Sequence, residues 1–401
     1  MLICLLSHYN RNVSSRSKKQ FSGLDPLSRK RSKESESETS SVLIVANMPP
    51  PTNGVSVVNS WVSEVIQEQG FVFKFIDTTA RASSFLFIFS RIAKYVYASI
   101  IVSIKIDYQI LYLPLGHGFS LLPQASLVLI ARLKGKRVLV HHHSYLPMST
   151  RNKILLFLHA RIFSRSEAIF LSAKMRDDYE NRFTSSSKKW IVRNAGAACN
   201  RMSKVDKLNL YEDSDLIWLA HASNLSVEKG ALVVIEVMSE LLSRFERVSC
   251  NLLGPVEDLR ILEKIMILQQ LYPGRFIHTG RYDSTLLSNV LSQTDFFLFP
   301  SNYMNEASPI VVLEAQCAGV TVIASNAGTI ESEILAPGCS VELNRWVETV
   351  TEKVEIMNSL PQERIVEYRR SSKLRMQGKM ERLGIRSRVD MITALSNGDQ
   401  Q

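Results

Sequence analysis

Cysteine is scarce in this sequence. The 401 residues include five cysteines, which form neither a CxxC pair nor a spacing typical of metal ligands: Cys4, Cys199, Cys250, Cys317 and Cys339. Because an odd and scattered set of cysteines is typical of free thiols, the sequence predicts a protein of a reducing compartment. Glycine and proline are not enriched and 45% of the residues are hydrophobic, so we expect most of the chain to fold around hydrophobic cores.

Long uninterrupted apolar segments are missing as well. The longest candidate, Ser84 to Ile106, is interrupted by Arg91, Lys94 and Lys105, so we expect no segment that spans a membrane. The apolar run at residues 2–6 is too short for a signal peptide and has no basic residue before it.

The sequence also lacks the signatures of nucleic-acid-binding proteins, although its net charge is +10. It has no zinc-ligand spacing, no RNP-like motif and no basic heptad helix. The charge is uneven, with +4 in residues 1–40, +13 in residues 41–210 and −7 in residues 211–401. The basic half, with its basic and apolar segments at 84–106 and 132–137, predicts docking on an anionic membrane surface. We therefore expect a cytoplasmic protein held peripherally at the inner face of the cell membrane, with no nucleic-acid partner.

Two successive series of short apolar runs, separated by helical patterns, predict two parallel sheets. Strands that are covered on both faces form continuous apolar runs. The runs are 41–47, 71–76, 108–113, 137–141 and 168–172, then 215–220, 248–254, 275–280, 295–300 and 321–325. The predicted fold class is α/β, with two doubly wound, Rossmann-like domains facing a central cleft at the carboxyl ends of the strands.

The domain boundaries follow from this pattern. We assign residues 41–205 to an N-terminal domain, residues 206–385 to a C-terminal domain, and residues 386–401 to a C-terminal helix and tail. Residues 1–40 are basic and serine-rich, which predicts a disordered extension.

A candidate anion site follows the strand at 295–300. Ser308 is a suitable N-cap, Pro309 suits the first position of a helix, and Gly319 suits the position after its end, so we expect a helix over Pro309–Ala318. The free N–H groups near its start, at Ile310 and Val311, would bind phosphate.

Two glutamates accompany this helix, eight positions apart. Glu306 lies on the loop before it, and Glu314 lies inside an otherwise apolar segment, where a carboxylate needs a specific partner. A second candidate phosphate contact follows the strand at 215–220, where Lys229 and Gly230 precede a helix that starts near Ala231.

The strand followed by SNLSVEKG, then E-x₇-E within NEASPIVVLEA, then CAGVTVIAS, resembles the retaining family 4 glycosyltransferases of GT-B fold. The likeness covers about residues 41–385 and suggests the type that builds bacterial surface polysaccharides. It implies a nucleotide diphosphate sugar in the C-terminal domain and a glycan or lipid-linked acceptor in the N-terminal domain, with no metal or other cofactor required.

The resemblance also implies roles for single residues. Lys229 would neutralise the donor diphosphate, Glu306 would contact the donor sugar, and Glu314 would contact the ribose hydroxyls. Ser308 and the N–H groups of Ile310 and Val311 would complete the donor site.

One position departs from the family pattern. Asn224 stands where the family usually has an arginine, so Arg193, Arg281 or a metal would have to supply the missing positive charge at the diphosphate.

The N-terminal domain has matching features. Asn53 and Gly54 open a helix after the first strand, as the family's glycine loop does, and Gly54 would let the backbone approach the substrates closely. Alternation places His141 and His143 on one face of a strand. The resemblance implies a histidine here that contacts the donor sugar near the reacting carbon, and we expect it to be His143, the later of the two. We expect the acceptor or sugar pocket to be lined by Asn53, His141 and His117, the last of which lies at another strand end.

The sequence therefore predicts a retaining hexosyltransferase with Glu306, His143 and Lys229 as its catalytic residues. Two alternatives remain. A nucleotide-sugar epimerase of similar fold would need a distinct acid and base in the cleft, which the sequence does not point to. A catalytically weak or inactive partner subunit would be consistent with Asn224.

Overall fold

The computed structural model describes residues 41–50, 52–79, 84–104, 107–116, 118–203 and 214–396. The extension predicted at residues 1–40 and the candidate His117 lie outside these described residues.

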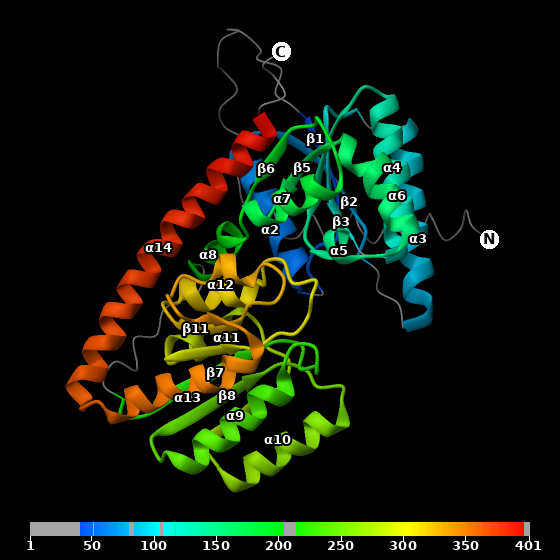
Figure 1. Cartoon of the computed structure of the whole chain (residues 1–401). Coiled ribbons are helices and arrows are strands. Elements are labelled where there is room, and N and C mark those ends of the chain that lie inside the picture. Colours follow the sequence, from blue (N-terminus) through cyan, green and yellow to red (C-terminus); the bar gives the residue numbers. More distant parts are fainter. Residues whose placement is uncertain are drawn as a thin grey trace, which may run out of the picture. The chain divides into compact units, whose positions relative to one another are not determined.

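The first half of the chain forms a six-stranded parallel sheet in the order β2-β1-β3-β4-β5-β6 (Figure 1). Its strands are β1 (Ser41–Ala46), β2 (Val72–Asp77), β3 (Ile110–Leu115), β4 (Arg137–His142), β5 (Glu167–Phe170) and β6 (Lys189–Ile191). The helices between them are α2 (Gly54–Glu68), α3 (Ser84–Ile104), α4 (Leu121–Leu133), α5 (Leu146–Ser149), α6 (Lys153–Arg161), α7 (Ala173–Arg182) and α8 (Ala195–Ser203). Short 3-10 turns lie at η1 (Gly118–Ser120) and η2 (Phe163–Arg165).

The second half forms another six-stranded parallel sheet, in the order β12-β11-β10-β7-β8-β9. Its strands are β7 (Ile217–Ala222), β8 (Val248–Leu253), β9 (Phe276–Thr279), β10 (Phe296–Phe299), β11 (Thr321–Ser325) and β12 (Ser340–Val341). The accompanying helices are α9 (Ala231–Arg244), α10 (Leu259–Leu271), α11 (Ser284–Ser292), α12 (Ile310–Cys317), η3 (Ile330–Glu333), α13 (Leu343–Ser359) and α14 (Gln362–Ser396). The predicted α/β class with two doubly wound sheets is confirmed.

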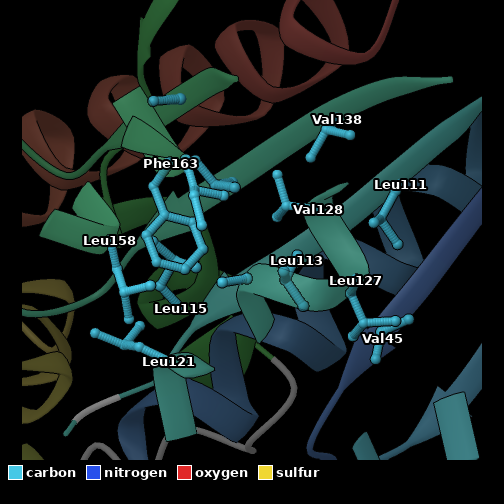
Figure 2. Close-up of a cluster of buried hydrophobic side chains, with 14 of the residues drawn as sticks. Val45, Leu111, Leu113, Leu115, Leu121, Leu127, Val128, Val138, Leu158 and Phe163 are labelled. Carbon is cyan, nitrogen blue, oxygen red and sulfur yellow. The ribbon is translucent and has the colours of Figure 1, made fainter. Parts of the chain in front are cut away.

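Each sheet is apolar on both faces, as continuous apolar strands require. In β1, Leu43 and Val45 pack with α3 and α4, whereas Val42 and Ile44 pack with α2 and the end of α14. Figure 2 shows the first of these clusters, where Val45 lies near side chains of β3 and α4. Burying each such side chain contributes about 1.5–3 kcal/mol, so the two clusters fix the sheet between its helix layers.

Helix α14 begins well before the C-terminal helix and tail predicted at 386–401, and residues 386–396 form its final part. Residues 397–401 lie outside the described residues. Near its start, Arg369 forms an ion pair with Asp295 beside the second sheet, at 2.8 Å. Near its end, Leu395 packs in the core of the first sheet, and the Arg137 guanidinium donates to the Leu395 carbonyl oxygen at 2.7 Å. One helix therefore contacts both halves of the chain (Figure 1).

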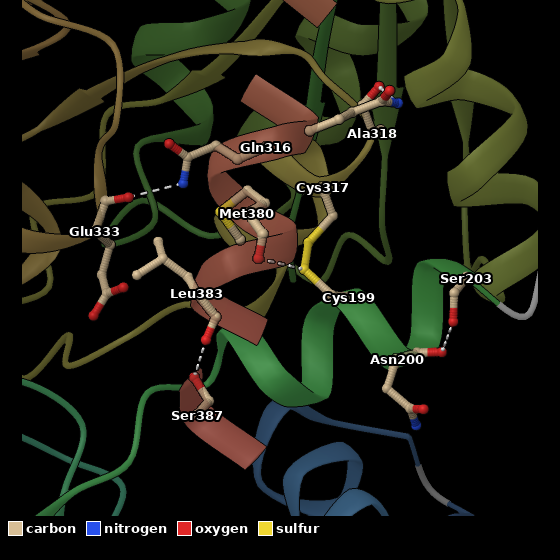
Figure 3. The surroundings of a disulfide bond; sticks show 11 residues. Cys199, Asn200, Ser203, Gln316, Cys317, Ala318, Glu333, Met380, Leu383 and Ser387 are labelled. Carbon is tan, nitrogen blue, oxygen red and sulfur yellow. Dashed lines mark hydrogen bonds between the residues drawn. A yellow bond between two sulfur atoms is a disulfide. The ribbon is translucent and has the colours of Figure 1, made fainter. Parts of the chain in front are cut away.

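The expectation of free thiols is wrong for two of the cysteines. Cys199 on α8 and Cys317 on α12 form a disulfide, with their Cα atoms 5.6 Å apart (Figure 3). The two positions are separated by 118 residues, and only the packing of α8 against α12 brings them together. Cys250 and Cys339 are buried free thiols, and Cys4 lies outside the described residues. The disulfide removes the support that free thiols gave to a reducing compartment.

Candidate active site

A cavity of about 770 Å³ opens where the strands of both sheets end, and most of the predicted site residues line it. Its walls come from the segment after β1, the ends of β4, β7 and β10, and the start of α12. The predicted residues that it brings together are Asn53, Gly54, His143, Asn224, Lys229, Glu306, Ser308, Ile310, Val311 and Glu314. The carboxyl ends of parallel strands are where doubly wound folds bind ligands.

Helix α2 begins at this cavity. Asn53 is its N-cap and forms a capping box with Ser56: the Ser56 N–H donates to Asn53 Oδ1 at 3.0 Å, and the Asn53 N–H donates to Ser56 Oγ at 2.9 Å. A Cβ atom at Gly54 would lie 3.7 Å from Ile310, an ordinary contact, so the starts of α2 and α12 face each other closely. Both helix N-termini carry partial positive charge.

Helix α12 begins one residue later than predicted. Its N-cap is Pro309 in an extended conformation, with no side-chain cap, so Ser308 lies outside the capping position. The first N–H that bonds within the helix belongs to Val312, and the N–H groups of Ile310 and Val311 precede it at the cavity wall. The predicted glycine after the helix is confirmed, because Gly319 has a φ of 91° and a Cβ there would lie 2.9 Å from the Lys373 backbone.

Lys229 lies on the loop between β7 and α9, next to a glycine that no other residue can replace without strain. Gly230 has a φ of 78°, and a Cβ there would lie 2.1 Å from the Pro300 carbonyl oxygen. This close approach brings the loop against the end of β10. The Lys229 ammonium consequently reaches the loop that carries Glu306 and lies 5.0 Å from the centroid of the Tyr303 ring.

The Lys229 ammonium forms an ion pair with the Glu306 carboxylate, which is 7% exposed. The Ser301 hydroxyl also donates to Glu306 Oε1, at 3.3 Å. Lys229 and Glu306 have different predicted ligands, the diphosphate and the sugar, and here they neutralise each other. This pair places one positive and one negative group together at the cavity wall.

Glu314 has a partner that the sequence did not reveal. Arg201 of α8 donates to Glu314 Oε1 at 2.6 Å, and the Glu314 residue is 1% exposed. Burial raises the pKa of Glu314, and the Arg201 charge opposes that rise. Arg201 lies in the last turn of an alanine-rich helix with no motif around it, so no local signal could have identified it.

The cavity wall holds three cations and two carboxylates: Arg201, Lys229 and Arg281, with Glu306 and Glu314. Because the first two cations are paired, Arg281 is the lining cation with no carboxylate partner in the described part of the chain. Arg193 does not line the cavity, and its guanidinium lies 3.8 Å from Glu333. Of the two arginines considered for the charge missing at Asn224, only Arg281 faces the cavity.

The three histidines at the end of β4 differ in burial: His141 and His142 are buried, and His143 is partly buried. His143 lines the cavity, and its ring centroid lies 4.0 Å from that of His141, so the predicted shared face is observed. His141 is fully buried, 2.7 Å from the Tyr112 hydroxyl, and does not reach the cavity, because β4 continues in the centre of its sheet to His142. Burial lowers the pKa of His141 and of His142 well below the usual value, so both rings are neutral. Within the described residues, no three His, Cys, Asp or Glu side chains gather as metal ligands.

Part of the chain is similar in sequence to known glycosyltransferases. Residues 203–347 match the family Glycosyl transferases group 1. Over 123 residues the chain is 28% identical to granule-bound starch synthase 1 of Pisum sativum, an alignment that covers 30% of this chain and 19% of that protein. The chain thus matches about a fifth of the length of this relative.

Solved structures share the fold over most of the chain. HepE of Anabaena in complex with UDP and glucose is 14% identical with a TM-score of 0.63, covering 89% of this chain and 100% of that chain. Sucrose-phosphate synthase of Thermosynechococcus elongatus is 13% identical with a TM-score of 0.60, covering 86% and 97%. These likenesses confirm the predicted GT-B fold.

Proposed function

We propose that this protein is a retaining, family 4-like hexosyltransferase that moves a hexosyl unit from a nucleotide diphosphate sugar to a hydroxyl of a glycan or lipid-linked acceptor. The observation that carries the proposal is the cavity where the start of α12, Lys229 and Glu306 meet. The match to Glycosyl transferases group 1 and the UDP and glucose bound by HepE support it.

The donor diphosphate binds at the start of α12. The N–H groups of Ile310 and Val311 donate to its oxygens, where the helix dipole favours negative charge. Lys229 exchanges its contact with Glu306 for the diphosphate, and Arg281 supplies the second positive charge in place of the residue that Asn224 does not provide. The proposed transfer requires no metal or other cofactor.

Displacement of Lys229 frees the Glu306 carboxylate to accept hydrogen bonds from the donor sugar. Glu314, oriented by Arg201, accepts bonds from the ribose, and His143 lies near the reacting carbon. The bond between the anomeric carbon and the diphosphate oxygen breaks as the acceptor oxygen bonds to the same face of that carbon. The acceptor proton passes to the departing diphosphate, whose charge the cations stabilise.

The acceptor is presented at an anionic membrane surface. Helix α4 packs beside α3 and α6 (Figure 1), and these helices expose Val96, Tyr97, Ile100, Leu122, Leu129, Leu133, Ile154 and Phe157. The exposed cations Arg132 and Lys134 stand at the end of α4. An apolar face with adjacent basic residues suits the boundary of an anionic bilayer. No helix among the described residues has both the length and the apolar character to cross a membrane.

A second candidate is a partner subunit without catalytic activity. Asn224 and the mutual neutralisation of Lys229 and Glu306 favour it, because both reduce the positive charge available to a diphosphate.

A donor screen tests the proposal. Thermal unfolding is measured with a panel of nucleotide sugars, since a bound ligand stabilises the protein by about 2.7 kcal/mol at a hundred times its Kd. We expect one nucleotide sugar to raise Tm, and the sugar to appear on an added hydroxyl acceptor with its anomeric configuration unchanged. Absence of binding by every donor would favour the partner subunit, and conversion of the donor without an acceptor would favour an epimerase.

A further inference from the structure

A second cavity, of about 340 Å³, lies at the opposite end of the second sheet from the active-site cavity. It is bounded by α13, α14 and the segment before β12, and Phe296 and Thr321, the first residues of β10 and β11, form its floor. The active-site cavity lies beyond the last residue of β10, so the two cavities occupy opposite ends of the same strands. Figure 1 shows α13 and α14, which frame this second cavity.

The interior of the second cavity is largely apolar. Its walls include Leu335, Met357, Leu360 and Met376, and Ile356 stands at the rim with 55% of its surface exposed. A volume of this size is at the lower end of small-molecule sites, which combine apolar walls with a few polar groups.

The charged groups at the second cavity are all cations, beside the neutral polar side chains of Thr321, Tyr368 and Ser372. Lys353 comes from α13, and Arg375 and Lys379 come from α14. Neither aspartate nor glutamate is among the described residues that line it. Arg375 and Lys379 form no ion pair in the described part of the chain.

The sequence of α14 also provides no carboxylate that could neutralise these cations within the helix. Arg375 and Lys379 are four residues apart, so their side chains are neighbours on one face, and no carboxylate lies three or four residues from either of them. Like charges at this spacing destabilise a helix slightly, and an anion between them would relieve the repulsion. By contrast, Arg386 further along the same helix pairs with Asp390 at 3.0 Å.

We propose that this second cavity binds an amphipathic organic anion, with its apolar body against Met357, Leu360 and Met376 and its carboxylate or phosphate between Arg375, Lys379 and Lys353. Apolar walls exclude a free inorganic anion as the complete ligand, and three cations without a carboxylate disfavour a neutral or cationic one. The site does not depend on the proposed transferase activity, because its residues lie outside the active-site cavity.

Calorimetric titration of the full chain tests this site with three probes of one shape: 2-naphthyl phosphate, 2-naphthoate and the neutral 2-naphthamide. We expect both anions to bind saturably and the amide to bind at least about tenfold more weakly, because it forms no charge-assisted hydrogen bonds. The anion that binds with the higher affinity shows whether the site prefers a phosphate or a carboxylate head group. Equal binding of the amide, or no saturable binding of either anion, would overturn the proposal.

A pair of matched double variants localises the binding. Arg375→Ala with Lys379→Ala should weaken the binding of the better anion by at least about tenfold. Arg382→Ala with Arg386→Ala removes the same charge from α14 outside the cavity and should leave the affinity within about twofold. Both pairs are on the surface of α14, and an unchanged Tm checks that the fold survives. Equal affinities of the two double variants would contradict the assignment.

Discussion

The ammonium of Lys229 and the carboxylate of Glu306 are in contact at the wall of the active-site cavity. Each neutralises the charge that the other would offer to a ligand, so binding of the proposed donor would have to separate them. The proposed diphosphate can do so because it carries more negative charge than the carboxylate it displaces, and the start of α12 adds further positive potential.

Glu306→Gln tests this exchange with little change of shape. We expect turnover to fall by about 10²–10³, the effect of removing one group that stabilises the transition state. Donor affinity should change less, because Lys229 becomes free for the diphosphate. The measurements are steady-state kinetics and calorimetric donor titration. Glu228→Gln, an exposed acid next to Lys229, is the control, and equal rates in the two variants would argue against this site.

Arg281→Ala should weaken donor binding by about tenfold or more, because a charge-assisted contact to the diphosphate contributes roughly 1.5–3 kcal/mol. Arg193→Ala is the matched control, since Arg193 points to Glu333 outside the cavity. Titration with the nucleoside diphosphate alone separates the diphosphate contact from sugar recognition. If both variants bind the diphosphate as the natural chain does, Arg281 has no part in the site.

Glu333 predicts a pH-dependent stability. Burial raises the pKa of Glu333 from 4.5 to about 7. The folded protein therefore holds this proton over a pH range in which the unfolded chain has lost it, and the free energy of unfolding decreases as pH rises from about 4.5 to 7. Glu333→Gln should remove about 3 kcal/mol of that decrease, measured by urea unfolding across this range. If the free energy of unfolding varies with pH in the same way for the natural chain and for Glu333→Gln, the prediction is contradicted.

The disulfide between Cys199 and Cys317 closes a long loop, so its loss should be costly. We expect Cys317→Ala to lower the free energy of unfolding by about 2–5 kcal/mol. Dithiothreitol should destabilise the natural chain in the same sense and leave the variant unchanged, which separates loss of the bond from loss of side-chain packing. A natural chain that is unaffected by complete reduction would rule out a stabilising role.

The proposed membrane face is tested by sedimentation with vesicles at low salt. Leu133→Asp with Phe157→Asp places charge on two of its most exposed apolar positions, at 88% and 59% exposure. We expect most of the binding to anionic vesicles to disappear, whereas Leu271→Asp, an equally apolar change on α10, should leave it intact. Equal binding of the natural chain to neutral and anionic vesicles would refute the proposal.

The strands were predictable because local composition determines them. The apolar run at 137–141 became β4 over Arg137–His142, and the run at 321–325 became β11 without any change of bounds. Strands β6 and β12 were missed because three and two residues are too short to form a recognisable run.

Most candidate site residues were predictable for a similar reason, since the ends of parallel strands meet at one edge of a sheet. Contacts between distant segments were not. Arg201 reaches Glu314, and Cys199 reaches Cys317, through the packing of α8 against α12, and neither helix sequence indicates its partner. His141 was misplaced because alternation gives the face of a strand but not the point at which a central strand ends.

Helix α14 has a further consequence. Its 35 residues give a rod of about 52 Å, with Arg369 anchored beside the second sheet and Leu395 packed into the first. Any change in the angle between the sheets must bend this helix or break the contacts at one of its ends. Shortening the chain by its last dozen residues would therefore remove Met391, Ala394 and Leu395 from the core of the first sheet and weaken this link between the sheets, without touching any residue that lines the active-site cavity.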